Sequence, residues 1–201
     1  GPNMLLLSSF GNGIGTFNTQ TETFEKGIMV NPSWINCIKK DHQQNYWIST
    51  YSGLWYVDGE LKGNRHYSSD DGYLPDNSVN YIYINRQNHV WCATNRGIMI
   101  LNPMTEEHRH LLVGHSICSI EEDALGMLWI SSRDGLFRYN PDNGEMIEFG
   151  IEDGLGGSEF SRAASALTSS GMACFGGING VTIIKSDNLT DSVIPGKVIP
   201  R

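Results

Sequence analysis

Short stretches of alternating apolar and polar residues recur along this chain, each interrupted by a small turn-forming segment. The clearest is WISSRDGLFRYN at 129–140, where two runs of strand-forming residues flank a polar segment that contains Gly. Alternation over four to eight residues is typical of half-buried strands, and Gly beside polar residues is typical of turns. The stretch therefore predicts a strand, a tight turn and a second strand. No segment shows a sustained 3.6-residue period, so helical arrays are excluded.

The same pattern occurs five times without a gap. The other copies are LSSFGNGIGTFN (7–18), WISTYSGLWYVD (47–58), WCATNRGIMILN (91–102) and CFGGINGVTIIK (174–185). A Gly stands six residues after the first position of every copy, and the residue before it is Asn, Ser, Arg or Asp. Such pairs predict a type I′ hairpin turn with positive φ at both residues, which Arg96 fits less well than Asn or Asp.

Further strands are expected on both sides of these hairpins. Three inner strands are predicted at 34–41, 78–85 and 116–123, and a short outer strand is predicted at 146–149. Four strands per unit and a period of about 40 residues describe the blade of a β-propeller. The fold class is therefore all-β, a β-propeller fragment of about five four-stranded blades with the first and last incomplete.

The domain organisation follows from the same pattern. Residues 1–4 are expected to be an expression remnant or N-terminal tail, and 187–201 a C-terminal exit or linker toward a following domain. The partial propeller occupies 5–186, with blades near 5–30, 31–68, 76–112, 115–150 and 158–186. The incomplete blades leave open edges, which predicts a homo-oligomer that covers them.

Composition and charge narrow the classes of partner. The chain has 201 residues and a formal net charge of −8. A negative charge of this size opposes sequence-independent binding to nucleic acid phosphates, so no nucleic acid partner is expected. No apolar run is long enough to span a bilayer. The four cysteines are widely spaced and form no CxxC pair, so we expect buried small side chains, or a disulfide if the protein is exported. No metal or cofactor is predicted.

The pattern D-x-x-G-x-L-W-I-x-[ST]-x-x-G-L-x-[RY]-Y-[ND]-P resembles the two-component regulator propeller repeat. It is matched closely by Asp123–Pro141 and more loosely by Asp41–Asp58 and Asn85–Pro103, and the segment DDGYLPDNSVNYIYIN (70–85) is similar to that family's connector. The resemblance implies the periplasmic sensor region of a membrane-anchored hybrid histidine kinase/response regulator of Bacteroidetes type. It implies an oligosaccharide-type ligand, a periplasmic location, and no catalysis by the segments present here.

Candidate ligand contacts are the residues that differ between copies within the constant frame of the repeat. The turns between second and third strands and the connectors between blades emerge on one face, where ligands commonly bind around the channel. Arg forks, carboxylates and amides in these turns suit hydroxyl-rich or anionic sugars, although solvated turns explain the same residues. The predicted ligand contacts are Tyr51, Asn95, Arg96, Arg133, Asp134 and Asn179.

Other chemistry-bearing residues have simpler interpretations. Trp47, Trp91 and Trp129 occupy one equivalent strand position, so packing between blades is favoured over sugar stacking. The oxygen-rich connector 68–78 has the ligands but not the spacing of an EF-hand calcium loop, and turn capping is expected. A metal site at His108 and His110, and a glycosidase acid pair within 121–123, are weaker alternatives.

Two other functions stay open from the sequence. A lyase-like enzyme on a similar propeller would need His42, His89 or the acidic residues to converge on the channel. A passive protein-interaction scaffold would need no small ligand. An enzyme would turn over a substrate, whereas a sensor would bind its ligand unchanged and signal through the C-terminal exit.

Overall fold

A computed structural model describes residues 3–9, 13–26, 34–184 and 197–198, and the strands form five antiparallel sheets in chain order. Blade one contains β1 (Met4–Ser9), β2 (Gly13–Asn18) and β3 (Thr23–Lys26). Blade two contains β4 (Ile35–Lys40), β5 (Tyr46–Thr50), β6 (Gly53–Val57) and β7 (Asn64–Tyr67). Blade three contains β8 (Val79–Ile84), β9 (Val90–Thr94), β10 (Gly97–Leu101) and β11 (His108–Leu111).

The last two blades complete the described chain. Blade four contains β12 (Ile117–Glu122), β13 (Leu128–Ser132), β14 (Leu136–Tyr139) and β15 (Met146–Phe149), and β19 (Lys197–Val198) pairs with β15. A 3-10 helix (Ile151–Asp153) leads to blade five, which contains β16 (Phe160–Leu167), β17 (Ala173–Gly177) and β18 (Gly180–Ile184). In the part of the chain just defined, no helix has the length and hydropathy of a membrane span.

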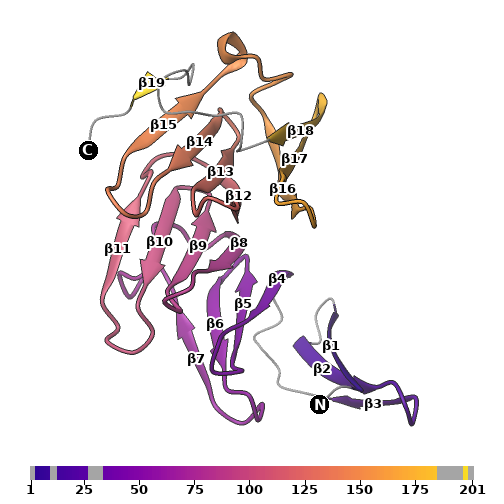
Figure 1. Ribbon diagram of the computed structural model, residues 1–201. Helices are drawn as coiled ribbons and strands as arrows, with labels where there is room; N and C mark the ends of the chain where they lie inside the picture. Colours follow the sequence, from indigo (N-terminus) through magenta and orange to yellow (C-terminus); the bar gives the residue numbers. More distant parts are fainter. Residues whose placement is uncertain (1–2, 10–12, 27–33, 185–196, 199–201) are drawn as a thin grey trace.

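The sheets follow one another in an arc, with the inner strands β4, β8, β12 and β16 toward its middle (Figure 1). Blades one and five have three strands each among the described residues, and the three blades between them have at least four. The predicted fold class, a propeller fragment with incomplete first and last blades, is confirmed. The expected terminal segments fall mostly on residues 1–2, 185–196 and 199–201, which lie outside the described residues.

The antiparallel order gives the arc two faces. The turns between second and third strands lie beside the segments that lead into the inner strands: backbone N–H groups of Asn95, Arg133 and Ile178 donate to the carbonyl oxygens of Ser78, Ser116 and Glu159. We call this the connector face. The turns that follow the inner and the third strands lie on the opposite face.

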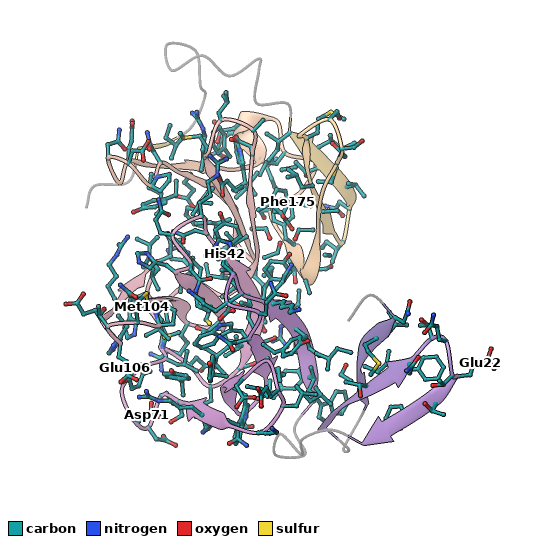
Figure 2. The ribbon with its side chains drawn as sticks, turned by 60° about the horizontal axis from the view of Figure 1, so that its bottom comes forward. Glu22, His42, Asp71, Met104, Glu106 and Phe175 are labelled. Atoms are coloured by element: carbon teal, nitrogen blue, oxygen red, sulfur yellow. The ribbon has the colours of Figure 1, made fainter. Side chains whose placement is uncertain are left out.

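Packing between blades is built around the repeated Trp. Trp47, Trp91 and Trp129 are at most 3% exposed, and each lies in an apolar cluster that joins its blade to a neighbouring blade, as predicted. Trp91, for example, packs on Tyr139 of blade four with ring centroids 5.8 Å apart. In the cluster around Trp129, Phe175 lies on the side of blade five that faces blade four (Figure 2). Burial of these large rings stabilises the stack of blades.

A second link between blades lies on the inner strands. β4, β8 and β12 each contain a one-residue bulge, at Asn36, Asn80 and Cys118. Each bulged side chain donates to a backbone carbonyl oxygen in the inner strand of the next blade, at 2.8 Å for Asn36 and Asn80 and 3.2 Å for Cys118. The acceptors are Val79, Ile117 and Phe160, equivalent positions of successive blades. A bulge re-aims a side chain, and here it aims a donor at the neighbouring blade.

The predicted type I′ turns are wrong. In blades two and three the turn residues are Tyr51-Ser52 and Asn95-Arg96, one position earlier than expected, and none of them has positive φ. The Gly that follows, Gly53 or Gly97, takes the positive φ alone, at 122° or 131°.

The physical reason is a hydroxyl at the start of each turn. Thr50, Thr94 and Ser132 accept a hydrogen bond from the backbone N–H two residues later and donate to the carbonyl oxygen of the following Gly. Ser and Thr stabilise turns in this way. Arg96 therefore carries no penalty for a left-handed conformation.

Candidate ligand-binding site

Two of the six predicted ligand contacts meet on the connector face. Tyr51 of the β5–β6 turn and Asn95 of the β9–β10 turn both contact Arg162, a residue of β16 in blade five. Arg162 Nη1 lies 3.3 Å from the Tyr51 hydroxyl, and Nη2 lies 3.1 Å from Asn95 Oδ1. The guanidinium also lies over the Tyr51 ring, 5.8 Å from its centroid. One arginine therefore joins three blades near the channel.

The other four predicted contacts are not brought to this cluster. Each of these four residues instead contacts a segment that joins two successive blades. Arg133 pairs with Glu159 at 3.3 Å, Asp134 with His115 at 3.0 Å, Asn179 donates to the Gly156 carbonyl oxygen at 3.3 Å, and the Arg96 carbonyl oxygen accepts from the Gly114 N–H at 3.0 Å.

The position of Arg162 depends on an irregularity in β16. Phe160 pairs with Gly177 and Ser165 with Phe175, so the inner strand carries three more residues than its partner between these two pairs. Within this bulge Ala163 has a φ of 52°, a conformation that costs energy for a residue with a Cβ. The bulge turns Arg162 away from the regular pleat and toward blades two and three.

Arg162 leaves hydrogen-bonding capacity unused. Its Nε is buried and has no hydrogen-bond partner among the described residues. Asn95 Oδ1 also accepts from Asn80 Nδ2 at 3.1 Å, and Asn80 Oδ1 is buried without a partner in the described part of the chain. Because a buried polar group without a partner is destabilising, this arrangement suits a site completed by ligand or water.

A second polar chain runs along the inner strands of four blades. Lys39 Nζ donates to the Tyr81 hydroxyl at 3.1 Å, and that hydroxyl donates to Glu121 Oε1 at 3.0 Å. Ser165 Oγ donates to the same carboxylate oxygen at 2.7 Å. β4, β8, β12 and β16 each supply one member, so these side chains couple the blades around the channel.

The electrostatics of this chain keep Tyr81 neutral and Lys39 charged. Burial raises the pKa of Tyr81 above its ordinary value. Burial alone would lower the pKa of Lys39, but the hydrogen bond from Lys39 to the Tyr81 hydroxyl and the nearby Glu121 carboxylate raise it overall. A cation, a neutral hydroxyl and a carboxylate therefore alternate, which balances the charges.

The oxygen-rich connector has the capping role expected of it. Asp71 Oδ1 accepts from the Ser68 N–H at 3.0 Å, and Asp76 Oδ1 accepts from the Ser78 N–H at 2.8 Å. Asn77 Oδ1 accepts from the Ser69 N–H at 2.7 Å. Across residues 3–9, 13–26, 34–184 and 197–198, no group of three or more His, Cys, Asp or Glu side chains is arranged to hold a metal ion.

The remaining candidates are also accounted for by local contacts. His108 and His110 on β11 contact the carbonyl oxygens of Gly72 and Tyr73 in the connector, at 3.2 and 2.8 Å. All four cysteines are free, and burial raises the pKa of Cys37, Cys92 and Cys118. These thiols are therefore poor nucleophiles at neutral pH.

The residues required by an enzyme do not converge on the Arg162 cluster. His42 and His89 belong to the β4–β5 and β8–β9 turns on the opposite face. Glu121 is held by Tyr81 and Ser165, and Glu122 pairs with Arg86 at 3.1 Å. In the described part of the chain, Glu121 and Glu122 thus bond to side chains of neighbouring blades.

Comparison with known proteins supports the propeller fold. Histidine kinase P4 of Formosa agariphila is 23% identical over 205 residues, which cover 93% of this chain and 15% of the kinase. The extracellular domain of a hybrid two-component system from B. thetaiotaomicron superposes with a TM-score of 0.78 at 17% identity, over 98% of this chain and 32% of that one. This chain shares the β-propeller fold of that extracellular domain. The resemblance expected from the repeat is therefore confirmed.

Other comparisons set the limits of this likeness. No family model matches the chain. A second extracellular domain of a B. thetaiotaomicron hybrid two-component system has a TM-score of 0.76 at 18% identity, over 99% of this chain and 26% of that one. Virginiamycin B lyase of Staphylococcus aureus has a TM-score of 0.73 at 13% identity, over 98% of this chain and 65% of the lyase. The chain thus spans about a third or less of the length of the histidine kinase and of the two extracellular domains that it matches.

Proposed function

We propose that this chain is a non-catalytic, ligand-recognising part of the periplasmic propeller of a membrane-anchored two-component sensor. The extracellular domains that share its fold and the histidine kinase related to its sequence support a sensor role. The observation that carries the proposal is the Arg162 cluster, because it joins side chains from three blades and leaves polar groups unsatisfied.

The ligand class that fits this cluster is an oligosaccharide. The guanidinium of Arg162 supplies N–H donors in a fixed plane, Asn80 supplies a buried amide oxygen, and Tyr51 supplies a ring that is 42% exposed. Sugar rings present hydroxyls that both donate and accept, together with apolar C–H faces that pack on aromatic rings. Binding there would change contacts between blades two, three and five, which gives the sensor its conformational readout.

The test is binding to a glycan array of neutral and acidic oligosaccharides, followed by calorimetry with the strongest binder. Arg162→Ala is expected to weaken that binding at least about tenfold, since a hydrogen bond to a charged group is lost. Arg65→Ala is the matched control, because Arg65 lies on outer strand β7 and pairs with Glu106. Binding that survives Arg162→Ala unchanged would reject the site.

The same experiment separates a sensor from an enzyme and from a scaffold. The recovered oligosaccharide is expected to be chemically unchanged by mass spectrometry after long incubation. A cleaved product would instead identify a lyase-like activity. A chain that ignores every glycan but retains a protein partner would be a scaffold.

The open ends of the arc are proposed to be covered by a second copy. Leu5 and Leu7 of β1 are 51% and 41% exposed, and Val181 and Ile183 of β18 are 67% and 58% exposed. Each pair lies on one face of its strand, as an interface between blades requires. Multi-angle light scattering is expected to give a mass above that of one chain, reduced by Val181→Asp. A mass of one chain at all concentrations would reject this proposal.

A further inference from the structure

Two quasi-equivalent cavities lie on the opposite face, one between blades two and three and one between blades three and four. The first includes Trp47, Arg65 and Pro103 in its lining, and the second includes Trp91, Arg109 and Pro141. The strand register makes these residues equivalent, since Trp47 pairs with Tyr56 and Tyr56 with Arg65, just as Trp91 pairs with Ile100 and Ile100 with Arg109. Each cavity therefore contains one Trp and one Arg in the same relative positions.

In the first cavity both donors have carboxylate partners from the chain itself. Trp47 Nε1 donates to Asp41 Oδ2 at 3.1 Å, and Arg65 forms an ion pair with Glu106. Met104 and Glu106 project from the β10–β11 turn, at the rim of this cavity (Figure 2). The first cavity is thus internally neutralised.

In the second cavity neither of the two equivalent positions carries a carboxylate. Asn85 replaces the Asp at the position equivalent to Asp41. Trp91 is only 3% exposed, and its Nε1 is buried and has no hydrogen-bond partner among the residues that the structure describes. Gly144 replaces Glu106, because Glu106 and Gly144 occupy the same place in their turns: their N–H groups donate to Asn102 and Asn140, each at 2.8 Å.

The amide of Asn85 adds a donor rather than an acceptor. Its Oδ1 accepts from the backbone N–H groups of Gln87 and His89, at 3.1 and 2.8 Å. The Nδ2 group therefore occupies the place of the Asp oxygen that accepts from the Trp in blades two and four. The cavity has two donors, the Asn85 amide and the Trp91 indole, where its counterpart has a donor and an acceptor.

Arg109 forms no ion pair with a carboxylate among the described residues. Glu122, which lines the cavity, is held by Arg86 at 3.1 Å and by the Tyr83 hydroxyl. Arg109 contacts only a neutral group in the described structure, the Tyr139 hydroxyl at 3.3 Å. Asp142 lies at the rim in the position that Met104 occupies in the first cavity.

We propose that this second cavity binds a small organic acid through its carboxylate. An acidic saccharide is the class of acid that fits the size of the cavity. The carboxylate takes the place of the two side-chain carboxylates that the first cavity contains, and accepts hydrogen bonds from Asn85, Trp91 and Arg109. The volume is about 470 Å³, within the range of small-molecule sites, and apolar side chains such as Leu125 and Leu128 line it. The site is independent of the proposed function, because it lies on the opposite face from Arg162.

The test follows the five indole N–H resonances of the full chain by ¹H–¹⁵N NMR, with Trp91 assigned from Trp91→Phe. Glucuronate is expected to shift the Trp91 resonance, whereas glucose at the same concentration leaves it in place. Acetate shows whether the carboxylate alone suffices: a shift with acetate or with glucuronate supports the site. No shift with either acid, or an equal shift with glucose, overturns it.

Matched variants make the assignment specific. Arg109→Gln is expected to weaken glucuronate binding at least about tenfold. Arg65→Gln, in the first cavity, is expected to keep the affinity for glucuronate within about twofold of that of the parent chain. Asn85→Asp supplies the missing acceptor, so it is expected to abolish binding and move the free Trp91 resonance toward those of Trp47 and Trp129. Unchanged binding in Arg109→Gln or an unmoved Trp91 resonance in Asn85→Asp contradicts the proposal. Arg162→Ala is expected to leave this site intact, which separates it from the glycan site.

Discussion

Trp129 Nε1 donates a 2.8 Å hydrogen bond to Asp123 Oδ2, and both residues are buried. The other carboxylate oxygen of Asp123 accepts from the N–H groups of Leu125 and Met127. One carboxylate therefore closes the β12–β13 turn and fixes the ring that fills the space between blades four and five. The six-residue spacing from Asp to Trp in the repeat is explained by this bond, which blade two repeats with Asp41 and Trp47.

Asp123→Asn is expected to destabilise the chain by about 1–3 kcal/mol, because the Trp129 N–H is left buried without an acceptor. Urea unfolding at neutral pH measures the change. In a Trp129→Phe background the same substitution is expected to cost less, since no indole N–H remains to be satisfied. An equal cost in both backgrounds would show that the bond to Trp129 is not the cause. Asp142→Asn, at an exposed turn position, serves as the neutral control.

Asn80→Ala is expected to destabilise the chain by about 1–3 kcal/mol and to loosen blade three from blade four. Asn80 is fully buried and donates to the Ile117 carbonyl oxygen at 2.8 Å and to Asn95 at 3.1 Å. Its removal leaves the Ile117 carbonyl oxygen without this donor. Asn36→Ala is the matched control at the equivalent bulge, where the side chain is half-buried, and is expected to cost less. A larger cost for Asn36→Ala would contradict this account of the bulges.

The strand pattern of the propeller was predictable because the repeat supplies five aligned copies of one unit. Period-two alternation and a recurring Trp and Gly are local signals, and they located the hairpins and the packing of Trp47, Trp91 and Trp129 correctly. The turn type was wrong because the pattern draws attention to Gly, whereas the hydroxyl of Thr50 or Thr94 sets the conformation.

The candidate site was only partly predictable. Residues that differ between repeat copies mark the connector face, but they do not show which side chains meet on it. Tyr51 and Asn95 were identified from that variation, but their partner Arg162 was missed. It lies on an inner strand, and its direction depends on a bulge that is longer than the one-residue bulges of β4, β8 and β12. A signal was nevertheless present in SEFSRAASAL, where one Arg interrupts a strand of small residues. The donor pairing of Asn85 and Trp91 likewise becomes visible only when two blades are compared in three dimensions.

Gly53→Ala is expected to destabilise the chain more than Gly180→Ala, although the two positions have similar φ angles. Gly53 has a φ of 122° and Gly180 a φ of 119°, so Ala strains both, at about 1–3 kcal/mol. A Cβ on Gly53 would also lie 2.5 Å from the Tyr67 carbonyl oxygen, whereas a Cβ on Gly180 meets nothing within 4 Å. We expect the clash to add about 1–3 kcal/mol in urea unfolding. Equal costs would show that β7 moves freely to accept the methyl group.

Stability is expected to fall as the pH rises above 9, and Cys118 accounts for part of the decline. Burial raises its pKa from 9.0 to about 11, although Arg133 and Arg162 oppose the shift. A group whose pKa is raised by folding contributes its stability fully below its unfolded pKa and loses it as the pH passes the folded value. The loss from this thiol therefore falls between pH 9 and 11, and the raised pKa values of Tyr81 and Tyr83 extend the decline to higher pH.

Cys118→Ala tests this assignment by urea unfolding at pH 7, 9 and 11 under reducing conditions. Between pH 9 and 11 the variant is expected to lose stability less steeply, by up to about 1.4 kcal/mol per pH unit for the single proton removed. At pH 7 its dependence on pH is expected to match that of the parent chain, because the thiol is protonated in both the folded and the unfolded states. A variant that declines as steeply as the parent between pH 9 and 11 would show that Cys118 is not a source of the alkaline loss.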